Sequence, residues 1–206
     1  MATASVPRRL GILISGRGSN LLAIGEAIAA GRIDATIAVV VSSRAGAPGL
    51  ERAAAGGIPT AVVTPKDHAS REACDRAIVE VLRAHGVELV CLAGYMRLIT
   101  PAFVDAFPNA ILNVHPSLLP AFPGLDAQHQ AWEHGVRMSG ATVHFVTAEL
   151  DAGPIVMQAA VPVEDGDTAD TLSARILVEE HRIYPAAIAK VLAGGWSIDG
   201  RRVVWH

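Results

Sequence analysis

The chain has little cysteine, few aromatic residues and no long basic stretch. Its two cysteines, Cys74 and Cys91, lack the spacing of a metal site and form no disulfide framework, which is typical of a reduced cytoplasmic protein. No more than two arginines or lysines follow one another, and the net charge is −3. Because nucleic-acid surfaces usually carry a basic stripe, nucleic acid is not an expected partner.

Long hydrophobic runs are also absent. The strongly apolar stretches, such as Ile37–Val41, have the length of a strand and are far too short to cross a bilayer. After the two arginines that end Met1–Arg9, the apolar run Leu10–Ile14 is too short for a signal peptide. Neither membrane association nor secretion is therefore expected.

What remains is a core of small and branched aliphatic residues. Hydrophobic residues make up 51% of the chain but aromatic residues only 4%, so alanine, valine, leucine and isoleucine must fill the core. This composition favours parallel strands that are buried under helices on both faces of a sheet.

Strands and helices alternate through the first half of the chain. The expected strands are Leu10–Ser15, Thr36–Ser42, Thr60–Thr64, Glu88–Gly94 and Ala110–His115. The expected helices are Asn20–Ala30, Ala47–Ala55 and Arg71–His85, with Ser70 as a cap and Gly31 and Gly86 at helix ends. Repeated strand–helix units predict an α/β fold with a Rossmann-like, mostly parallel sheet.

The second half has a more antiparallel pattern. Two strands are expected, at Ala141–Thr147 and Pro154–Val163. A helix follows from about Thr168 to Ala193, capped by Asp167 or Thr168 and ended by Gly194 and Gly195. The last expected element is a hairpin in Ser197–Trp205 that turns at Asp199-Gly200. With no linker or internal repeat, residues 1–206 are predicted to form a single domain with two halves, about 8–110 and about 111–206.

The segment Asn113–Pro120 carries the most information about function. Asn113 and His115 lie two residues apart at the end of an expected strand, so their side chains point to the same face and can meet one substrate atom. Pro116 ends the strand, and Leu119-Pro120 is a candidate for a cis turn. An amide donor and a titratable imidazole on a stiff loop suit acyl-type transfer.

A second feature, Ser15–Asn20, joins the first strand to the first helix. Backbone N–H groups at a helix N-terminus favour phosphate, and the glycines of this loop let the backbone approach it. Leu21 stands where a dinucleotide fingerprint has its third glycine, no acid follows the second strand, and no Gly-Lys-Ser/Thr forms a Walker loop. The expected ligand is a phosphomonoester.

The acidic turn Glu149–Pro154 is the third feature. Alone it is a surface hairpin, but if Ala141–Thr147 pairs with Ala110–His115, Asp151 reaches His115 and favours an imidazolium there. His144 alternates within its strand and is expected to be structural or to support a catalytic residue. His129 and His134 have a poor spacing for a metal.

With these segments the chain resembles the glycinamide ribonucleotide formyltransferases, folate-dependent enzymes of purine synthesis. The matching segments, in the family's order, are Ile14–Asn20, Leu92–Arg97, Asn113–Pro120, Val143–Val146, Glu149–Pro154, Glu180-His181 and Ile183–Pro185. The resemblance covers about residues 8–205. The stretch His115–Pro120 is shared with other formyl-folate enzymes, whereas the Gly-x-Gly-Ser-Asn loop narrows the resemblance to this family.

The resemblance implies a formyl transfer from 10-formyltetrahydrofolate to the amine of glycinamide ribonucleotide, without metal, in a monomer or homodimer. The implied catalytic residues are Asn113, His115 and Asp151. Gly18, Ser19 and Asn20 would hold the ribonucleotide phosphate, and Glu180 would lie near its glycinamide end. The implied folate-binding residues are Arg71, Met96, Arg97, Leu98, Ile99, Asn113, Ala148, Glu149, Leu150, Asp151 and Ala152.

Three alternatives are weighed against this interpretation. A formyltetrahydrofolate hydrolase would use the same catalytic trio on water, but its regulatory domain would precede Leu10, where the first strand already begins. A methionyl-tRNA formyltransferase would need a further C-terminal domain and a tRNA surface. A non-catalytic nucleotide-binding module would leave Asn113, His115 and Asp151 unexplained. Asp126 stands where the family usually has histidine, which leaves open how residues 121–140 fold over the folate.

Overall fold

The computed structural model describes residues 8–206 as two compact units, divided between Ala110 and Ile111. Each unit is described by itself below. The stretch Met1–Pro7, which belongs to the segment considered for a signal peptide, lies outside the described residues.

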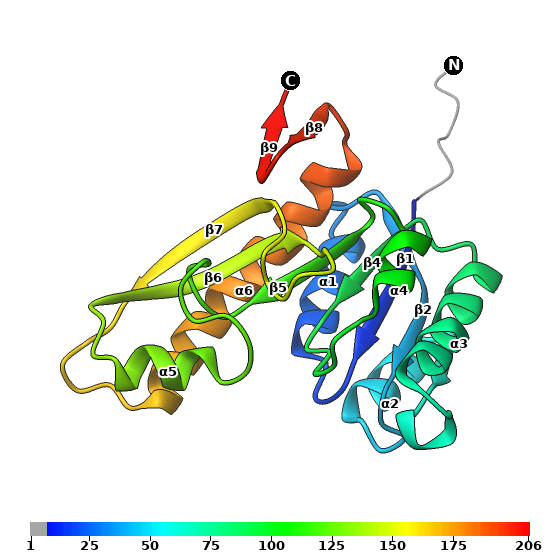
Figure 1. The fold of residues 1–206 in the computed structure, drawn as a ribbon, viewed down its shortest axis with the longest axis horizontal. Helices are drawn as coiled ribbons and strands as arrows, with labels where there is room; N and C mark the ends of the chain where they lie inside the picture. The colour runs from blue at the N-terminus through cyan, green and yellow to red at the C-terminus, as the bar shows by residue number, and fades with distance from the viewer. Residues whose placement is uncertain (1–7) are drawn as a thin grey trace. The chain divides into compact units, whose positions relative to one another are not determined.

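The first unit contains a four-stranded parallel sheet (Figure 1). Its strands are β1 (Arg8–Ile14), β2 (Ala35–Ser42), β3 (Thr60–Val62) and β4 (Leu89–Leu92), in the order β3-β2-β1-β4. Its helices are α1 (Ser19–Ala29), α2 (Pro48–Ala55), the 3₁₀ turn η1 (Pro65–Asp67), α3 (Arg71–Ala84) and α4 (Pro101–Ala106). The strands are largely buried and aliphatic, as the composition predicted.

The strand order decides which face each helix covers. The chain moves from β1 to β2 to β3 in one direction through α1 and α2, then returns past β1 to β4 through α3. Because strand–helix–strand crossovers are right-handed, this reversal places α3 on the face opposite to α1 and α2. A reversal of this kind between neighbouring strands, here β1 and β4, is where open α/β sheets bind ligands.

The second unit is mainly antiparallel. Its strands are β5 (Ile111–His115), β6 (Met138–Phe145), β7 (Ile155–Pro162), β8 (Trp196–Asp199) and β9 (Arg202–Trp205), in the order β5-β6-β7-β9-β8. Only the β7–β9 pair is parallel among the pairs described here. Its helices are the short α5 (Ala127–Glu133) and the long α6 (Ala169–Leu192), which packs along β6 and β7. The predicted fold class, an α/β fold with a more antiparallel second half, is confirmed.

Most predicted helix ends are confirmed. Ser70 accepts a hydrogen bond from the N–H of Ala73, and Thr168 forms a reciprocal capping box with Thr171 at the start of α6. Gly31, Gly86 and the Gly194-Gly195 pair have the positive φ of residues that follow a helix. The helices α4 and α5 were not predicted, although Thr100-Pro101 carries a recognisable helix start.

The predicted hairpin turn at Asp199-Gly200 is wrong by one residue. Trp196 pairs with Trp205 and Asp199 with Arg202, so the two-residue loop is Gly200-Arg201. Gly200 therefore takes the first position of the loop, where its φ of 57° is the left-handed conformation that favours glycine.

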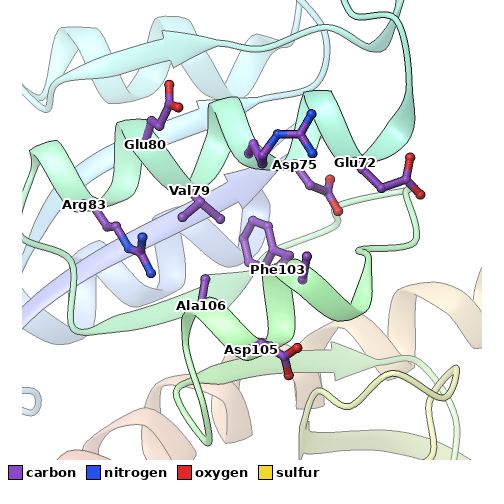
Figure 2. A pocket seen from close by; sticks show the side chains of 10 residues that line it. Glu72, Asp75, Val79, Glu80, Arg83, Phe103, Asp105 and Ala106 are labelled. Atoms are coloured by element: carbon purple, nitrogen blue, oxygen red, sulfur yellow. The ribbon is translucent and has the colours of Figure 1, made fainter.

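Two further observations concern the surface. Among residues 8–206 no helix is long and apolar enough to cross a membrane. A groove of about 380 Å³ runs between α3 and α4, with Val79 and Phe103 at its floor and Glu72, Glu80 and Arg83 among its charged walls (Figure 2). None of the residues predicted for catalysis or binding lines this groove.

Candidate active site

The catalytic trio expected from the sequence is assembled within the second unit. Asn113 and His115 lie on β5. Strand β6 pairs with β5, which was the condition for Asp151 to reach His115. The turn after β6 then brings the Asp151 carboxylate to His115, with Oδ2 3.4 Å from Nδ1, and both side chains are more than nine-tenths buried. The predicted approach of Asp151 to His115 is therefore confirmed.

His144 joins this group from the neighbouring strand. It pairs with Asn113 across β5 and β6, and the Asn113 amide Nδ2 lies 3.2 Å from His144 Nε2. His144 Nδ1 lies 2.9 Å from the Phe145 carbonyl oxygen, which can only accept. Nδ1 thus carries the proton and Nε2 accepts from Asn113, which is a neutral tautomer.

The surroundings of His144 agree with a neutral ring. Burial lowers the pKa of His144, and this effect exceeds the opposing effects of the Phe145 carbonyl and of Asp151, whose Oδ1 is 3.7 Å from Nε2. His144 therefore acts as an acceptor that orients Asn113. The expected supporting role, rather than a catalytic one, fits this position.

His115 is held from both sides of its ring. Nε2 donates to the backbone carbonyl of Phe122 at 2.8 Å, while Nδ1 faces Asp151. Both contacts are hydrogen bonds at the same time only when both ring nitrogens carry protons. The sequence did not reveal the partner of Nε2, because that partner is a backbone atom in a loop.

The same loop also holds Asp151. The N–H of Gly124 donates to Asp151 Oδ2 at 2.8 Å, so residues 122–124 contact both His115 and its carboxylate partner. The turn itself is tight, since a Cβ on Gly153 would lie 1.8 Å from the Phe145 carbonyl oxygen. Asp151 has a φ of 49°, a left-handed conformation that aspartate tolerates better than most residues.

The predicted phosphate loop lies in the first unit, between β1 and α1. Gly18 occupies the N-cap of α1 with a φ of 73°, and Ser19 and Asn20 are the next two residues. A Cβ on Gly18 would lie 3.0 Å from Cα of Gly49, which begins α2 behind the loop. The contact with Gly49 was missed from the sequence, although the Pro48-Gly49 helix start was a usable signal.

The loop after β4 is tied to the same end of the sheet. Ser15, at the end of β1, bonds through its hydroxyl to Ser43 at 2.7 Å and accepts the N–H of Met96 at 3.0 Å. The N–H of Ser15 also donates to Gly94. The predicted phosphate loop and the start of the predicted folate segment Met96–Ile99 therefore lie together at the carboxyl ends of β1 and β4, where the strand order reverses.

The other predicted binding residues take positions of different kinds. Met96, Leu98 and Leu150 are more than half exposed. Arg71 is exposed at the first position of α3, and Glu180 is buried in α6. The remaining predicted folate residues lie in the two loops, at Arg97, Ile99, Ala148, Glu149 and Ala152. Within residues 8–206 no group of histidine, cysteine and carboxylate side chains is arranged to hold a metal.

Comparison with known proteins gives the family. The formyl transferase family model matches residues 8–188. Phosphoribosylglycinamide formyltransferase of Escherichia coli is 46% identical over 190 residues, which cover 92% of this chain and 87% of that protein. The chain belongs to the formyl transferase family.

Solved structures agree with this assignment. Glycinamide ribonucleotide transformylase 1 from Symbiobacterium toebii is 55% identical, with a TM-score of 0.97 over 100% of this chain and 98% of that chain. A formyltetrahydrofolate deformylase from Pseudomonas syringae has a TM-score of 0.90 at 26% identity, over 98% of this chain and 66% of that chain. The chain also matches trifunctional purine biosynthetic proteins, of whose length it spans about 20%.

Proposed function

We propose that this protein transfers the formyl group of 10-formyltetrahydrofolate to the amine of glycinamide ribonucleotide, a step of purine biosynthesis. The observation that carries the proposal is the buried contact between His115 and Asp151 beside Asn113, in a chain of the formyl transferase family. The identities of 46% and 55% to proteins with this name support the transferase over its relatives.

Asn113 and His115 are assigned to the charge that develops during transfer. When the amine attacks the formyl carbon, the formyl oxygen becomes an oxyanion. The Asn113 amide has two N–H groups, and one of them donates to His144, which leaves the other for this oxyanion. A protonated His115 adds positive charge nearby. Its Nε2–H is bonded to the Phe122 carbonyl, so it can donate to the oxyanion only after that hydrogen bond is broken.

Asp151 is assigned to His115 and to proton transfer. Its carboxylate faces His115 Nδ1 at 3.4 Å and so holds the orientation of the imidazole ring. The attacking amine must lose a proton and the departing N10 must gain one, and we assign Asp151 to assist that transfer, with water as the carrier. The balance of the reaction needs no metal, oxidant or covalent enzyme intermediate.

The binding roles are divided between the two units. Gly18, Ser19 and Asn20 would hold the ribonucleotide phosphate through the N–H groups at the start of α1, an arrangement that favours anions. Glu180 would contact the glycinamide end. The exposed apolar residues Met96, Leu98 and Leu150 would cover the folate, together with Arg71 and the backbone of the turn at 148–152.

The proposal extends to the setting of the enzyme. It describes residues 1–206 as one formyltransferase domain that acts in the cytoplasm as a monomer or homodimer on two small-molecule substrates, without nucleic acid or membrane. The shortage of basic stretches and the cysteine usage support these expectations.

A direct assay tests the proposal. Purified protein is mixed with 10-formyltetrahydrofolate, with and without glycinamide ribonucleotide, and tetrahydrofolate and formylated ribonucleotide are measured by absorbance and mass spectrometry. The expected result is folate turnover that requires the ribonucleotide and yields its formylated form. Turnover without the ribonucleotide would instead indicate the deformylase reaction, and no turnover in either mixture would favour a non-catalytic module.

A further inference from the structure

A fully buried hydroxyl lies on β6 directly opposite His115. Thr142 pairs with His115 across β5 and β6, and with Gln158 across β6 and β7, three strands that lie side by side in Figure 1. Side chains of directly opposed residues in antiparallel strands point to the same face. His115, Thr142 and Gln158 therefore form one row across the sheet.

The Thr142 hydroxyl uses all of its hydrogen-bonding capacity. It donates to the carbonyl of Ser117 at 2.7 Å and accepts the N–H of Leu119 at 3.0 Å. It also accepts from Gln158 Nε2 at 2.9 Å, and the same Nε2 donates to the Leu119 carbonyl at 3.0 Å. The donor and both lone pairs of the hydroxyl are thus used. Two of its three partners belong to the loop, and the third is the Gln158 amide that also holds the loop.

The clamped loop leads directly to the partners of the catalytic pair. Ser117 Oγ donates to the Ala121 carbonyl at 2.5 Å, and the N–H of Ala121 donates to Leu118. The next residue, Phe122, accepts from His115 Nε2, and Gly124 donates to Asp151. The side chains of β6 and β7 therefore fix the loop whose backbone holds His115 and Asp151.

We propose that Thr142 is a positioning residue for His115, with Gln158 as its support, because Thr142 fixes loop 117–124 so that the Phe122 carbonyl meets Nε2. Neither residue is assigned a contact with substrate. Removing the hydroxyl leaves the buried N–H of Leu119 and the Ser117 carbonyl without this partner, which allows the loop and the imidazole to shift. The inference rests on the proposed function for its kinetic consequence but not for its structural one.

Three variants of β6 test the proposal. Thr142→Val removes the hydroxyl at nearly constant shape, and Thr142→Ser keeps it. Ser139→Ala is the control, because Ser139 is 2% exposed on the same strand and its hydroxyl has no hydrogen-bond partner among the described residues. The expected result is a fall in kcat of about 100-fold for Thr142→Val with KM little changed, near-normal kcat for Thr142→Ser and no change for Ser139→Ala.

A spectroscopic readout separates positioning from general destabilisation. In the ligand-free protein the Nε2 proton of His115, protected by the Phe122 carbonyl, is expected in the imidazole region of the ¹H–¹⁵N spectrum. It should be present in the wild type, Thr142→Ser and Ser139→Ala, and lost in Thr142→Val. If Thr142→Val fails to fold, Gln158→Met, which removes one support from a more exposed position, should broaden the signal and lower kcat by a smaller factor.

The outcomes decide the proposal in either direction. A Thr142→Val or Gln158→Met protein that keeps both the imidazole proton and wild-type kcat overturns it, as does a Thr142→Ser protein that behaves like Thr142→Val. If the wild type shows no formyl transfer, the proposed function fails. The imidazole signal then still decides whether Thr142 positions His115.

Discussion

The Asn113 amide donates to Nε2 of His144 across β5 and β6, at 3.2 Å. Nδ1 of the same ring donates to a carbonyl while Nε2 accepts, so His144 is neutral, and its accepting nitrogen fixes which way the Asn113 amide faces. The orientation of Asn113, which we propose to be catalytic, thus depends on the protonation of a buried neighbour. This relationship leads to predictions about both activity and stability.

Asn113→Ala and His115→Ala should each lose most of kcat while KM for both substrates changes little. Both groups are assigned to charge that exists only in the transition state, and loss of one such donor typically costs on the order of 10²–10³-fold. Steady-state kinetics with both substrates varied would measure this. Near-wild-type turnover in either variant would show that its residue does not have the assigned role.

Stability should depend on pH through His144. Its pKa is lowered by burial, so below the ordinary pKa of about 6.5 the unfolded chain binds a proton that the folded protein does not. The neutral ring therefore contributes stability that is present above about pH 6.5 and is lost as the pH falls from there toward the folded pKa. Each unit by which folding lowers the pKa corresponds to about 1.4 kcal/mol of folding stability.

Urea denaturation at about pH 7.5 and about pH 5.5 checks this expectation, since both values bracket the ordinary histidine pKa. Wild type should lose more stability between the two than His144→Gln, which cannot titrate. His129→Gln serves as the matched control, because that histidine is exposed on α5 and should leave the pH dependence unchanged. Equal losses of stability in wild type and His144→Gln would mean that the buried ring does not cause the fall in stability at acid pH.

The contrast between predicted and unpredicted site residues has a physical basis. Asn113 and His115 could be paired from the sequence because the two-residue period of a strand fixes a shared face. Asp151 followed once β6 was expected beside β5. The partners Phe122 and Gly124 act through backbone atoms, which any residue has, so their identities carry no signal.

The fold, like the site, could be predicted where local sequence patterns determine it and not where it depends on contacts between distant segments. The alternation of aliphatic strands with amphipathic helices identified the parallel sheet around β1, because local periodicity reports burial directly. The turn at Gly200-Arg201 was misplaced by one residue, since a dipeptide alone does not fix how the two flanking strands pair. The role of Thr142 was equally hidden, because it arises from three strands and a loop that meet only after folding.

Gly18→Val should raise KM for the ribonucleotide by about tenfold or more, equivalent to about 1.4 kcal/mol of binding. A Cβ at this position meets the Gly49 backbone at 3.0 Å, and the φ of 73° is costly for a branched residue, so the N–H groups at the α1 start must move. Folate affinity should be retained. Gly46→Val is the control, because a Cβ there meets nothing within 4 Å and the residue is not at positive φ.

The two affinities distinguish a local effect from misfolding. A binding titration with each substrate, alongside a thermal melt, separates them. If Gly18→Val lowers the affinity for folate and ribonucleotide equally, the defect lies in folding and the loop loses its assignment as the phosphate site.

Asp126 should weaken binding of the folate cosubstrate slightly. It is exposed at the N-cap of α5, close in sequence to the loop that holds His115, and the glutamate tail of folate carries carboxylates that it would repel. Exposed charges interact weakly and are screened, so the effect should stay below about 1 kcal/mol. Asp126→Asn is the sharpest variant, because asparagine removes the charge and tolerates the φ of 54° found there.

Asp126→Asn should therefore lower KM for the folate cosubstrate at low salt, and Asp126→His, which restores the family's usual residue, should lower it by a similar or larger factor. The gain should fade as ionic strength rises, because screening removes the repulsion that the substitution relieves. Neither variant should change kcat or the ribonucleotide KM, since Asp126 makes no contact with Asn113, His115 or Asp151 among the described residues. A folate KM that ignores both the substitution and the salt would mean that Asp126 lies away from the tail, and that its departure from the family's histidine has no consequence for binding.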